Sequence, residues 1–308
     1  MLIWNENYLM GIEELDNDHR HMFQIAEQIL NRVRERSDDP AMRIFIIREG
    51  LKYLHGYFFR HAAQEEAYMR KIGYEGYALH KMQHDDFQKI QMAKYQKIVA
   101  SGTCSKEDVW DFIGSGVGWL LEHIATADMA IVGKGVLQKT VAADASVATL
   151  ENEINLLCIA TLNINAYVKV VNTNYTGESF GKAVCQKIVY EKDGQETTVI
   201  SGVERSFILY VAKMLYGGSV EDEMDLILST LEVFGAQFWI TLSRQLTGSS
   251  SMITIKENHF IMGGTLQEEL QKLEPAISVL FTSGKGQFFL SSSSKQLFQP
   301  QNKNAEME

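Results

Sequence analysis

One stripe of side chains constrains the fold of this chain more than any other feature. Between residues 47 and 65, side chains recur at spacings of four, three, four, three and four, which places them on one face of an α-helix. The stripe consists of Ile47, Leu51, Leu54, Phe58, His61 and Glu65. A helix that buries the first four members also buries an imidazole and a carboxylate. That burial is costly unless both groups are paired or bound to a metal.

Three further stretches of the first 132 residues show helical apolar spacing, over about 15–36, 77–99 and 105–130. Each also directs histidine toward its apolar face: His19 in the first, His80 and His84 in the second, and His123 in the third. The connections "RSDDP", "KIGYEGY" and "SGTCSKED" are short and rich in turn-forming residues. Four helices joined by short connections predict an antiparallel all-α four-helix bundle over residues 1–132.

The segment "LHKMQHDDF" carries two histidines, His80 and His84, one helical turn apart on one face. A lone histidine on an apolar face is usually a core residue with a hydrogen-bond partner. Five inward histidines and an inward glutamate on four helices are harder to explain in that way, because these positions offer few other polar residues. A metal ion would satisfy all of them together. The pattern therefore predicts a metal site inside the bundle.

Asp128 does not fit this pattern at first sight. It lies five residues after His123 in "HIATAD", and five residues of ideal helix leave two side chains about 140° apart. Both can face one site only if the helix is distorted, for example by a π-bulge or at a frayed end. Spacing alone therefore does not place Asp128 at the metal site.

The remainder of the chain has a different pattern and predicts an α+β domain. Residues 133–150 are expected to connect it to the bundle, residues 151–298 to form the domain, and residues 299–308 to be a disordered polar tail. Helices are predicted over 152–171, 205–217 and 222–246. Strands are predicted over 183–192 and 196–203 around an Asp-Gly turn, and over 251–256, 259–264 and 276–293. The chain is thus multidomain, with an all-α part followed by an α+β part.

Composition excludes several classes of function. The chain carries 29 Lys and Arg against 39 Asp and Glu, a formal net charge of −10, so nucleic acid is not an expected partner. The three cysteines, Cys104, Cys158 and Cys185, are widely spaced and odd in number, which favours reduced thiols in the cytosol. The N-terminus does not resemble a signal peptide, and the stretch 155–171 is too polar to span a membrane. We therefore expect a soluble, cytoplasmic protein.

The first domain resembles the hemerythrins, of the bacterial single-domain type, over about residues 2–132. The resemblance is carried by "WNENYLMGIEELDNDH", "HAAQEEAYM", "HKMQH" and "WLLEHIATAD". H-x-x-x-x-D is the family's own spacing, so Asp128 joins the ligands that the family pattern implies: His19, His61, Glu65, His80, His84, His123 and Asp128. Ala62 stands where the family more often has Phe, and His21 and His55 fall outside the pattern.

The resemblance implies a non-haem di-iron centre with an oxo or hydroxo bridge. His80, His84 and His123 would bind one iron, His19 and His61 the other, and Glu65 and Asp128 would bridge the two. The second iron would keep one open position, at which dioxygen binds reversibly as hydroperoxide. Five neutral imidazoles and only two carboxylates favour reversible binding over cleavage of the O–O bond. Apolar neighbours expected to exclude water are Phe23, Phe58, Phe87, Ile113 and Leu120.

Residues 148–298 resemble the CheX/CheC chemotaxis phosphatases, through "VISGVERSFILYVAKMLYGG", "DLILSTLEVFGAQF" and "ISVLFTSGKGQFFL". That family acts on a phosphorylated response regulator through E-x-x-N on the long helix. Here Glu232 matches the glutamate, but Gly235 replaces the asparagine that positions the attacking water. We therefore expect a domain without efficient phosphatase activity, which binds a CheY-like regulator or a second copy of the chain as a homodimer. The alternative explanation of Glu232 is a solvated helix residue, and the isolated His259 is expected to be structural.

Together these features predict an oxygen- or redox-sensing protein whose di-iron domain is coupled to a CheX-like output domain in chemotaxis-type signalling. Two other functions remain open. One is enzymatic: a di-iron peroxidase, a nitric-oxide-handling site or a response-regulator phosphatase. The other is oxygen storage or delivery, with the second domain serving for oligomerisation.

Overall fold

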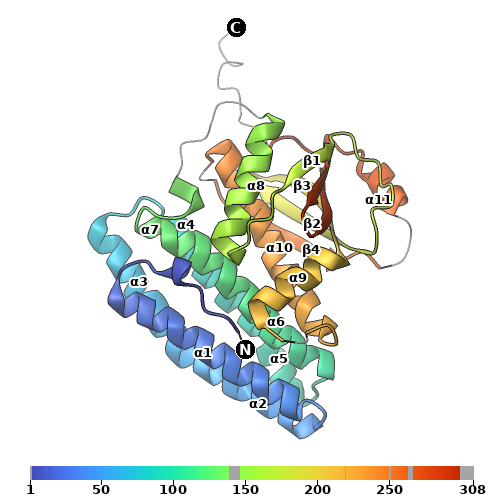
Figure 1. The fold of residues 1–308 in the computed structure, drawn as a ribbon. Coiled ribbons are helices and arrows are strands. Elements are labelled where there is room, and N and C mark those ends of the chain that lie inside the picture. Colours follow the sequence, from blue (N-terminus) through green and yellow to red (C-terminus); the bar gives the residue numbers. More distant parts are fainter. Residues whose placement is uncertain (1, 139–145, 219, 250, 263–265, 299–308) are drawn as a thin grey trace. The chain divides into compact units, whose positions relative to one another are not determined.

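A computed structural model describes residues 2–138, 146–218, 220–249, 251–262 and 266–298 (Figure 1). The chain forms two compact units. The first contains residues 1–135 together with 215–234, and the second contains residues 136–214 and 235–308. The predicted disordered tail, 299–308, and residues 139–145 of the predicted connection lie outside the described residues. The last residues of that connection, 147–150, belong to a helix, α8 (Val147–Leu162), rather than to a connection.

Four long helical runs form most of the first unit. The first run is α1 (Glu13–Arg36), which follows a short 3₁₀ turn, η1 (Glu6–Tyr8). The second is α2 (Pro40–Tyr53), η2 (Leu54–Phe58) and α3 (Phe59–Ile72). The third is α4 (Tyr77–Asp86), η3 (Phe87–Met92) and α5 (Ala93–Ser101). The fourth is α6 (Lys106–His123), η4 (Ile124–Asp128) and α7 (Met129–Ile131). The predicted all-α bundle is confirmed.

Local sequence explains where these runs begin and end. Asp39 accepts a hydrogen bond from the Ala41 backbone N–H and stands before Pro40, a favoured first residue of a helix. Ser105 forms a capping box with Asp108 at the start of α6. Gly73 ends α3 in the left-handed conformation, at φ 66°, which glycine adopts without a steric penalty.

Three of the four runs contain a π-helical segment, in which each turn is wider than in an α-helix. The segments are η2, η3 and η4, and each lies next to predicted ligands in the sequence. A distortion between His123 and Asp128 was predicted from their spacing, and η4 confirms it. The segments η2 and η3 were not predicted. π-Helical turns are rare in proteins and occur frequently at functional sites.

The second unit is built on a six-stranded sheet with the order β1-β5-β6-β3-β2-β4, in which all paired strands are antiparallel. The strands are β1 (Lys169–Asn172), β2 (Ala183–Lys192), β3 (Gln195–Glu204), β4 (Ile253–Phe260), β5 (Ile277–Ser283) and β6 (Gly286–Ser292). The helices of this half of the chain are α8 (Val147–Leu162), α9 (Arg205–Tyr216), α10 (Met224–Thr247) and α11 (Leu266–Leu273). The predicted α+β class is confirmed.

Three local predictions in this half were wrong. The helix expected over 152–171 ends at Asn163, which adopts the left-handed conformation at φ 54°, and residues 169–172 form β1 instead. The separate strands predicted at 251–256 and 259–264 are one strand, β4. Helix α11 was not predicted.

Helix α10 is long and apolar enough to cross a membrane, by length and composition alone. Within the structure, however, 61% of its apolar window is buried, as expected of a helix in a protein core.

Candidate metal centre

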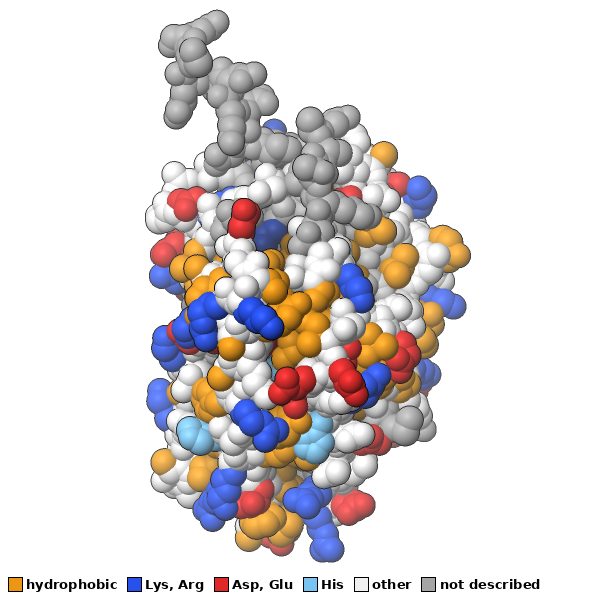
Figure 2. Space-filling model, turned by 90° about the vertical axis from the view of Figure 1, so that its left-hand side faces the viewer, with side chains coloured by type: hydrophobic (Ala, Val, Ile, Leu, Met, Phe, Trp, Pro, Cys, Tyr) orange, Lys and Arg blue, Asp and Glu red, His pale blue; other side chains and the backbone are white. Residues whose placement is uncertain are grey.

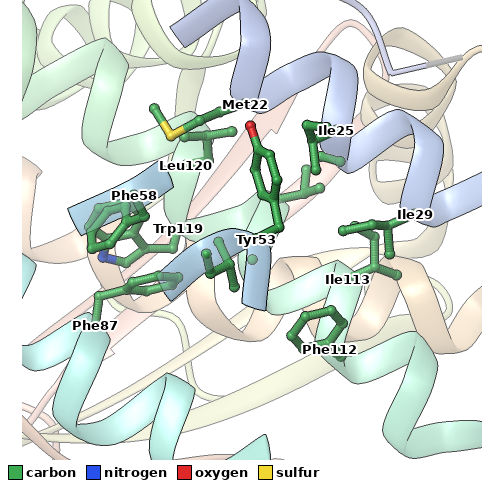
Figure 3. A pocket seen from close by; sticks show the side chains of 14 residues that line it. Met22, Ile25, Ile29, Tyr53, Phe58, Phe87, Phe112, Ile113, Trp119 and Leu120 are labelled. Atoms are coloured by element: carbon green, nitrogen blue, oxygen red, sulfur yellow. The ribbon is translucent and has the colours of Figure 1, made fainter. Parts of the chain in front are cut away.

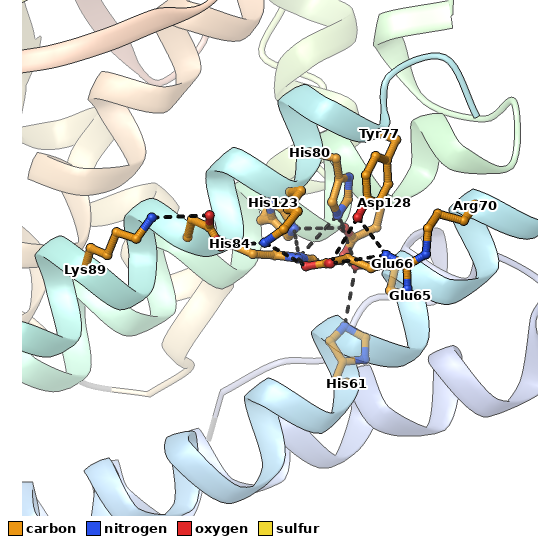
Figure 4. A network of polar contacts seen from close by, with 12 residues as sticks. His61, Glu65, Glu66, Arg70, Tyr77, His80, His84, Lys89, His123 and Asp128 are labelled. Atoms are coloured by element: carbon orange, nitrogen blue, oxygen red, sulfur yellow. Dashed lines mark hydrogen bonds and ion pairs between the residues drawn. The ribbon is translucent and has the colours of Figure 1, made fainter. Parts of the chain in front are cut away.

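The seven predicted ligands come together inside the bundle. Figure 4 shows His61, Glu65, His80, His84, His123 and Asp128 directed toward one another. Helix α1 contributes one histidine, α3 a histidine and a glutamate, α4 two histidines, α6 one histidine, and η4 the aspartate. All seven side chains are buried, with at most 4% of any residue exposed: His19, His61, Glu65, His80, His84, His123 and Asp128. Four separate helical runs therefore direct their buried polar residues to one place.

Three imidazoles approach one another through the same ring atom. The Nε2 atom of His84 lies 3.2 Å from that of His80 and 3.0 Å from that of His123. A neutral imidazole has one N–H donor and one lone pair, so three converging Nε2 atoms cannot all hydrogen-bond to one another. A cation between them would bind all three lone pairs at once.

The two carboxylates lie between this histidine group and the second one. The Oε2 atom of Glu65 is 3.0 Å from His80 Nε2 and 3.9 Å from His61 Nε2. The Oδ1 atom of Asp128 is 3.0 Å from His123 Nε2, whereas its Oδ2 atom is 3.2 Å from His19 Nε2. Each carboxylate therefore reaches both groups of histidines.

The π-helical segment explains how Asp128 reaches the site. In a regular α-helix the five residues from His123 would turn Asp128 away by about 140°. Segment η4 spans Ile124–Asp128 and has a wider turn, so both side chains face the bundle interior. Thr126, within the segment, donates a side-chain hydrogen bond to the Glu122 backbone carbonyl at 2.9 Å.

The histidines of the site lower the pKa values of its two buried carboxylates. Burial alone would raise the pKa of Glu65, but the adjacent His80, His84 and His61 outweigh it and hold the pKa well below its usual value. Burial and Glu65 act to raise the pKa of Asp128, but His123 and His19 outweigh them and lower it. Burial lowers the pKa of His123 to about 4, which keeps its imidazole neutral and able to bind a metal.

Several buried polar atoms of the site have no hydrogen-bond partner. They include both ring nitrogens of His19, Oε1 of Glu65 and both carboxylate oxygens of Asp128. Such atoms carry a desolvation cost that the surrounding protein does not offset. The donors fall into two groups that share Glu65: Glu65, His80, His84 and His123; and His19, His61, Glu65 and Asp128. Asp128 also reaches the first group, because its Oδ1 atom lies 3.0 Å from His123 Nε2. This mixture of imidazole and carboxylate donors suits iron and other first-row transition metals, so the residues fit a two-metal site.

Each histidine group also has a carboxylate on its outer side. Nδ1 of His61 lies 3.5 Å from Oδ2 of Asp18, and Nδ1 of His84 lies 3.5 Å from Oε1 of Glu66. Such outer carboxylates orient a metal-binding imidazole and strengthen it as a donor. Neither Asp18 nor Glu66 was identified from the sequence, because each is one of many charged residues on its helix.

Apolar side chains surround the site. Trp119 stacks on His123, with ring centroids 4.3 Å apart, and also on Phe87 at 4.3 Å; Phe58 lies edge-on to His84 at 5.7 Å. An apolar cavity of about 60 Å³ lies beside these rings (Figure 3). Four of the predicted apolar neighbours line it: Phe58, Phe87, Ile113 and Leu120. Phe23, the fifth, is buried against Trp4 and Tyr8.

The other histidines lie outside the metal site. His21 is partly buried and packs on Tyr57, with ring centroids 4.6 Å apart, while His55 is exposed. His259 is exposed on β4. Histidine side chains that reach the molecular surface are visible in the space-filling view (Figure 2).

Glu232, the predicted remnant of a phosphatase motif, lies on α10 and is partly buried. Burial and the nearby Asp111 raise the pKa of its carboxyl group, and Lys94 lowers it in part. It is therefore not the fully solvated helix residue that was the alternative explanation.

Fold and site together define a class of protein: a helical bundle with buried histidines and carboxylates that could hold metal. Residues 10–134 match the family model described as the hemerythrin HHE cation binding domain. The chain is 30% identical over 133 residues to a bacteriohemerythrin of Clostridium acetobutylicum, covering 42% of this chain and 96% of that protein. It is 28% identical over 131 residues to a bacteriohemerythrin of Stenotrophomonas maltophilia, covering 42% of this chain and 78% of that protein. The chain belongs to the hemerythrin family through its first half.

The second half is similar to solved structures of chemotaxis proteins. One is a CheX-CheY-BeF3-Mg²⁺ complex from Borrelia burgdorferi, with a TM-score of 0.33, 14% identity, and coverage of 48% of this chain and 97% of that one. Another is CheX from Desulfovibrio desulfuricans, with a TM-score of 0.31, 10% identity, and coverage of 47% and 97%.

Proposed function

We propose that the first unit binds two iron ions and takes up dioxygen reversibly at that pair. The observation that carries the proposal is the convergence of five buried imidazoles and two buried carboxylates, several of whose polar atoms have no hydrogen-bond partner. His80, His84 and His123 would hold one ion and His19 and His61 the other, with Glu65 and Asp128 shared. A ferrous iron pair held there would supply electrons to a bound diatomic ligand.

The residues around the pair support binding rather than turnover. Two anionic carboxylates among five imidazoles give less negative charge than the glutamate-rich sites of ferritin-like proteins, which disfavours highly oxidised iron. The aromatic side chains Phe58, Phe87 and Trp119 exclude water from one side of the histidines. A dry site slows the loss of a bound ligand by proton-assisted side reactions.

Metal analysis combined with optical spectra tests this function. The protein is loaded with ferrous iron without oxygen and then exposed to air. We expect two irons per chain, a charge-transfer band that appears with oxygen, and its disappearance when oxygen is removed. Fewer than two irons per chain, or no such band, would contradict the proposal. Steady consumption of peroxide would favour an enzyme instead.

We further propose that the second half of the chain, residues 148–298, is the output of a cytoplasmic sensor. The support is the sequence resemblance of residues 148–298 to proteins that act on a response regulator. Glu232 stands where that family has its glutamate, whereas Gly235 offers no side chain to position a water. The domain would therefore bind a CheY-like regulator, or pair with a second copy of the chain, without efficient dephosphorylation.

Coupling would run through the fourth helical run. Asp128 ends its π-helical segment, and the run itself ends at Ile131, just before the connection at 133–150. Loading of the metal site would change the balance between two conformations of this end. Regulator binding measured with reduced and with oxygenated protein tests the coupling. Equal affinities would contradict sensing and would favour oxygen storage, whereas faster loss of the regulator's phosphate would favour a phosphatase.

A further inference from the structure

Two buried polar atoms face each other on the outer side of the metal site. Nδ1 of His61, on α3, lies 3.5 Å from Oδ2 of Asp18, on α1. The two side chains are 2% and 11% exposed, and neither atom has another hydrogen-bond partner. Nε2 of the same imidazole faces Oε2 of Glu65 at 3.9 Å, toward the metal site. The ring of His61 is therefore held between the site and an outer carboxylate.

A phenol anchors that carboxylate from the other side. The Tyr57 hydroxyl donates a hydrogen bond to Oδ1 of Asp18 at 2.6 Å, a short distance typical of a strong bond to a charged acceptor. The guanidinium of Arg60 lies 4.4 Å from the centre of the Tyr57 ring, and Tyr53 stacks on it at 5.3 Å. Tyr57 belongs to η2, one helical turn before His61, so the π-helical segment positions the anchor.

We propose that Asp18 is a positioning residue that fixes the His61 ring and strengthens it as a metal donor, and that Tyr57 limits this effect. The inference rests on the proposed function, because it concerns the donors of that metal site. Nδ1–H of His61 would donate to Asp18 and leave Nε2 for the metal. A negative acceptor increases the electron density of the imidazole, which favours ferric over ferrous iron. The hydrogen bond from Tyr57 draws charge from the carboxylate and so weakens this preference for ferric iron.

Glu66 provides a comparison within the same bundle. It lies 3.5 Å from His84 Nδ1, but Lys81 Nζ at 3.8 Å and Arg70 Nη1 at 3.7 Å are also close to its carboxylate. Two cations offset its charge, whereas Asp18 has a hydrogen bond from the neutral Tyr57 and only a small Coulombic attraction to Arg60. We therefore expect Asp18 to have the larger electrostatic effect on its histidine, and the two halves of the metal site to have unequal donors.

The test uses three variants of the full chain: Asp18→Asn, Tyr57→Phe and, as a control, Glu14→Gln. Glu14 is an exposed carboxylate on the same helix, one turn before Asp18, and accepts a hydrogen bond from Gln64 at 2.7 Å. Iron per chain, ferrous affinity and the midpoint potential of the iron pair are measured. D18N should weaken ferrous binding by about 10–100-fold and raise the potential. A tenfold preferential loss of ferric binding corresponds to about 59 mV for one electron.

Tyr57→Phe gives the sharper test, because its shift should have the opposite sign. Without the phenol hydrogen bond the carboxylate keeps more of its charge, so Y57F should lower the potential, by less than D18N raises it. E14Q should change neither the ferrous affinity nor the midpoint potential. A purely structural role would shift the midpoint potentials of D18N and Y57F in the same direction, and that outcome would overturn the inference. A D18N potential equal to that of E14Q would also overturn it. Parent protein that binds iron but not dioxygen would refute the proposed function alone, and parent protein without bound iron would refute both.

Discussion

The cores of the two units deal with buried polar groups in different ways. In the second unit, Tyr190 donates its hydroxyl hydrogen bond to the Ala236 carbonyl at 2.8 Å, and Ser278 and Ser291 hydrogen-bond to each other at 2.8 Å. In the bundle, His19 and Asp128 keep buried atoms without partners. These buried groups of the second unit are satisfied by the protein's own atoms, whereas those of the metal site are ones that a bound ion would satisfy. Several unsatisfied atoms that converge on one point, rather than burial itself, indicate a candidate ligand set.

The strongest test of this contrast removes single ligands. His61→Ala and His84→Ala each delete a donor from one of the two groups, so we expect iron per chain to fall from two to one or none. His259→Ala, at an exposed position on β4, is the control and should keep the full iron content. Elemental analysis after ferrous loading measures the result. Retention of both irons by H61A and H84A would remove the basis of the proposed function.

Removal of the metal should affect only one of the two cores. A ligand present at about a thousand times its dissociation constant stabilises the protein that binds it by about 4 kcal/mol. Calorimetry of iron-loaded and chelated protein should therefore show a lower unfolding temperature for the first unit, with the transition of the second unit unchanged. Equal shifts of both transitions would show that the metal does not act on the bundle alone.

Tyr190→Phe tests the contribution of a buried hydrogen bond in the second unit. Tyr190 is 1% exposed, so loss of its hydroxyl leaves the Ala236 carbonyl without that donor. We expect a loss of about 1–2 kcal/mol in the free energy of unfolding of the second unit. Iron content should be unchanged. Denaturant unfolding followed by circular dichroism measures the loss, and a variant as stable as the parent would show that this bond contributes little.

The smallest effect is expected at Glu232. Burial and Asp111 raise its pKa in the folded state, so the folded protein holds this proton more tightly than the unfolded chain does. Stability therefore falls as pH rises from the unfolded value, 4.5, through the folded pKa. Glu232→Gln should stabilise the protein by less than about 1 kcal/mol at pH 7 and have no effect at about pH 4. Equal effects at both pH values would show that its charge is not the cause.

The sequence predicted the bundle well because its signals are local. Apolar spacing placed the helical runs, and the turn-forming connection "SGTCSKED" lies at the start of α6. The five-residue interval between His123 and Asp128 even predicted a distortion, which η4 provides. The contact of Asp18 with His61 could not be predicted, because it joins two helices and depends on how they are rotated about their axes.

Predictions for the second half were less complete for a different reason. Asn163 ends α8 by adopting a left-handed conformation, which asparagine tolerates but does not require. The apolar residues beyond it suit a strand as well as a helix, and pairing of β1 with β5 decides between them. Helix α11, LQEELQKL, has only eight residues, which is too short for periodicity alone to establish.

The wide turn of η4 absorbs one residue more than a regular helix would hold. A π-helical turn holds one more residue than the α-helical turn it replaces, so a chain shortened by one residue between Ile124 and Ala127 could form a regular helix there. The aspartate would then follow His123 by four residues, and side chains four residues apart lie on one face of an α-helix. Both side chains would still face the bundle interior. A descendant of this chain that lost the extra residue could thus keep both ligands at the site.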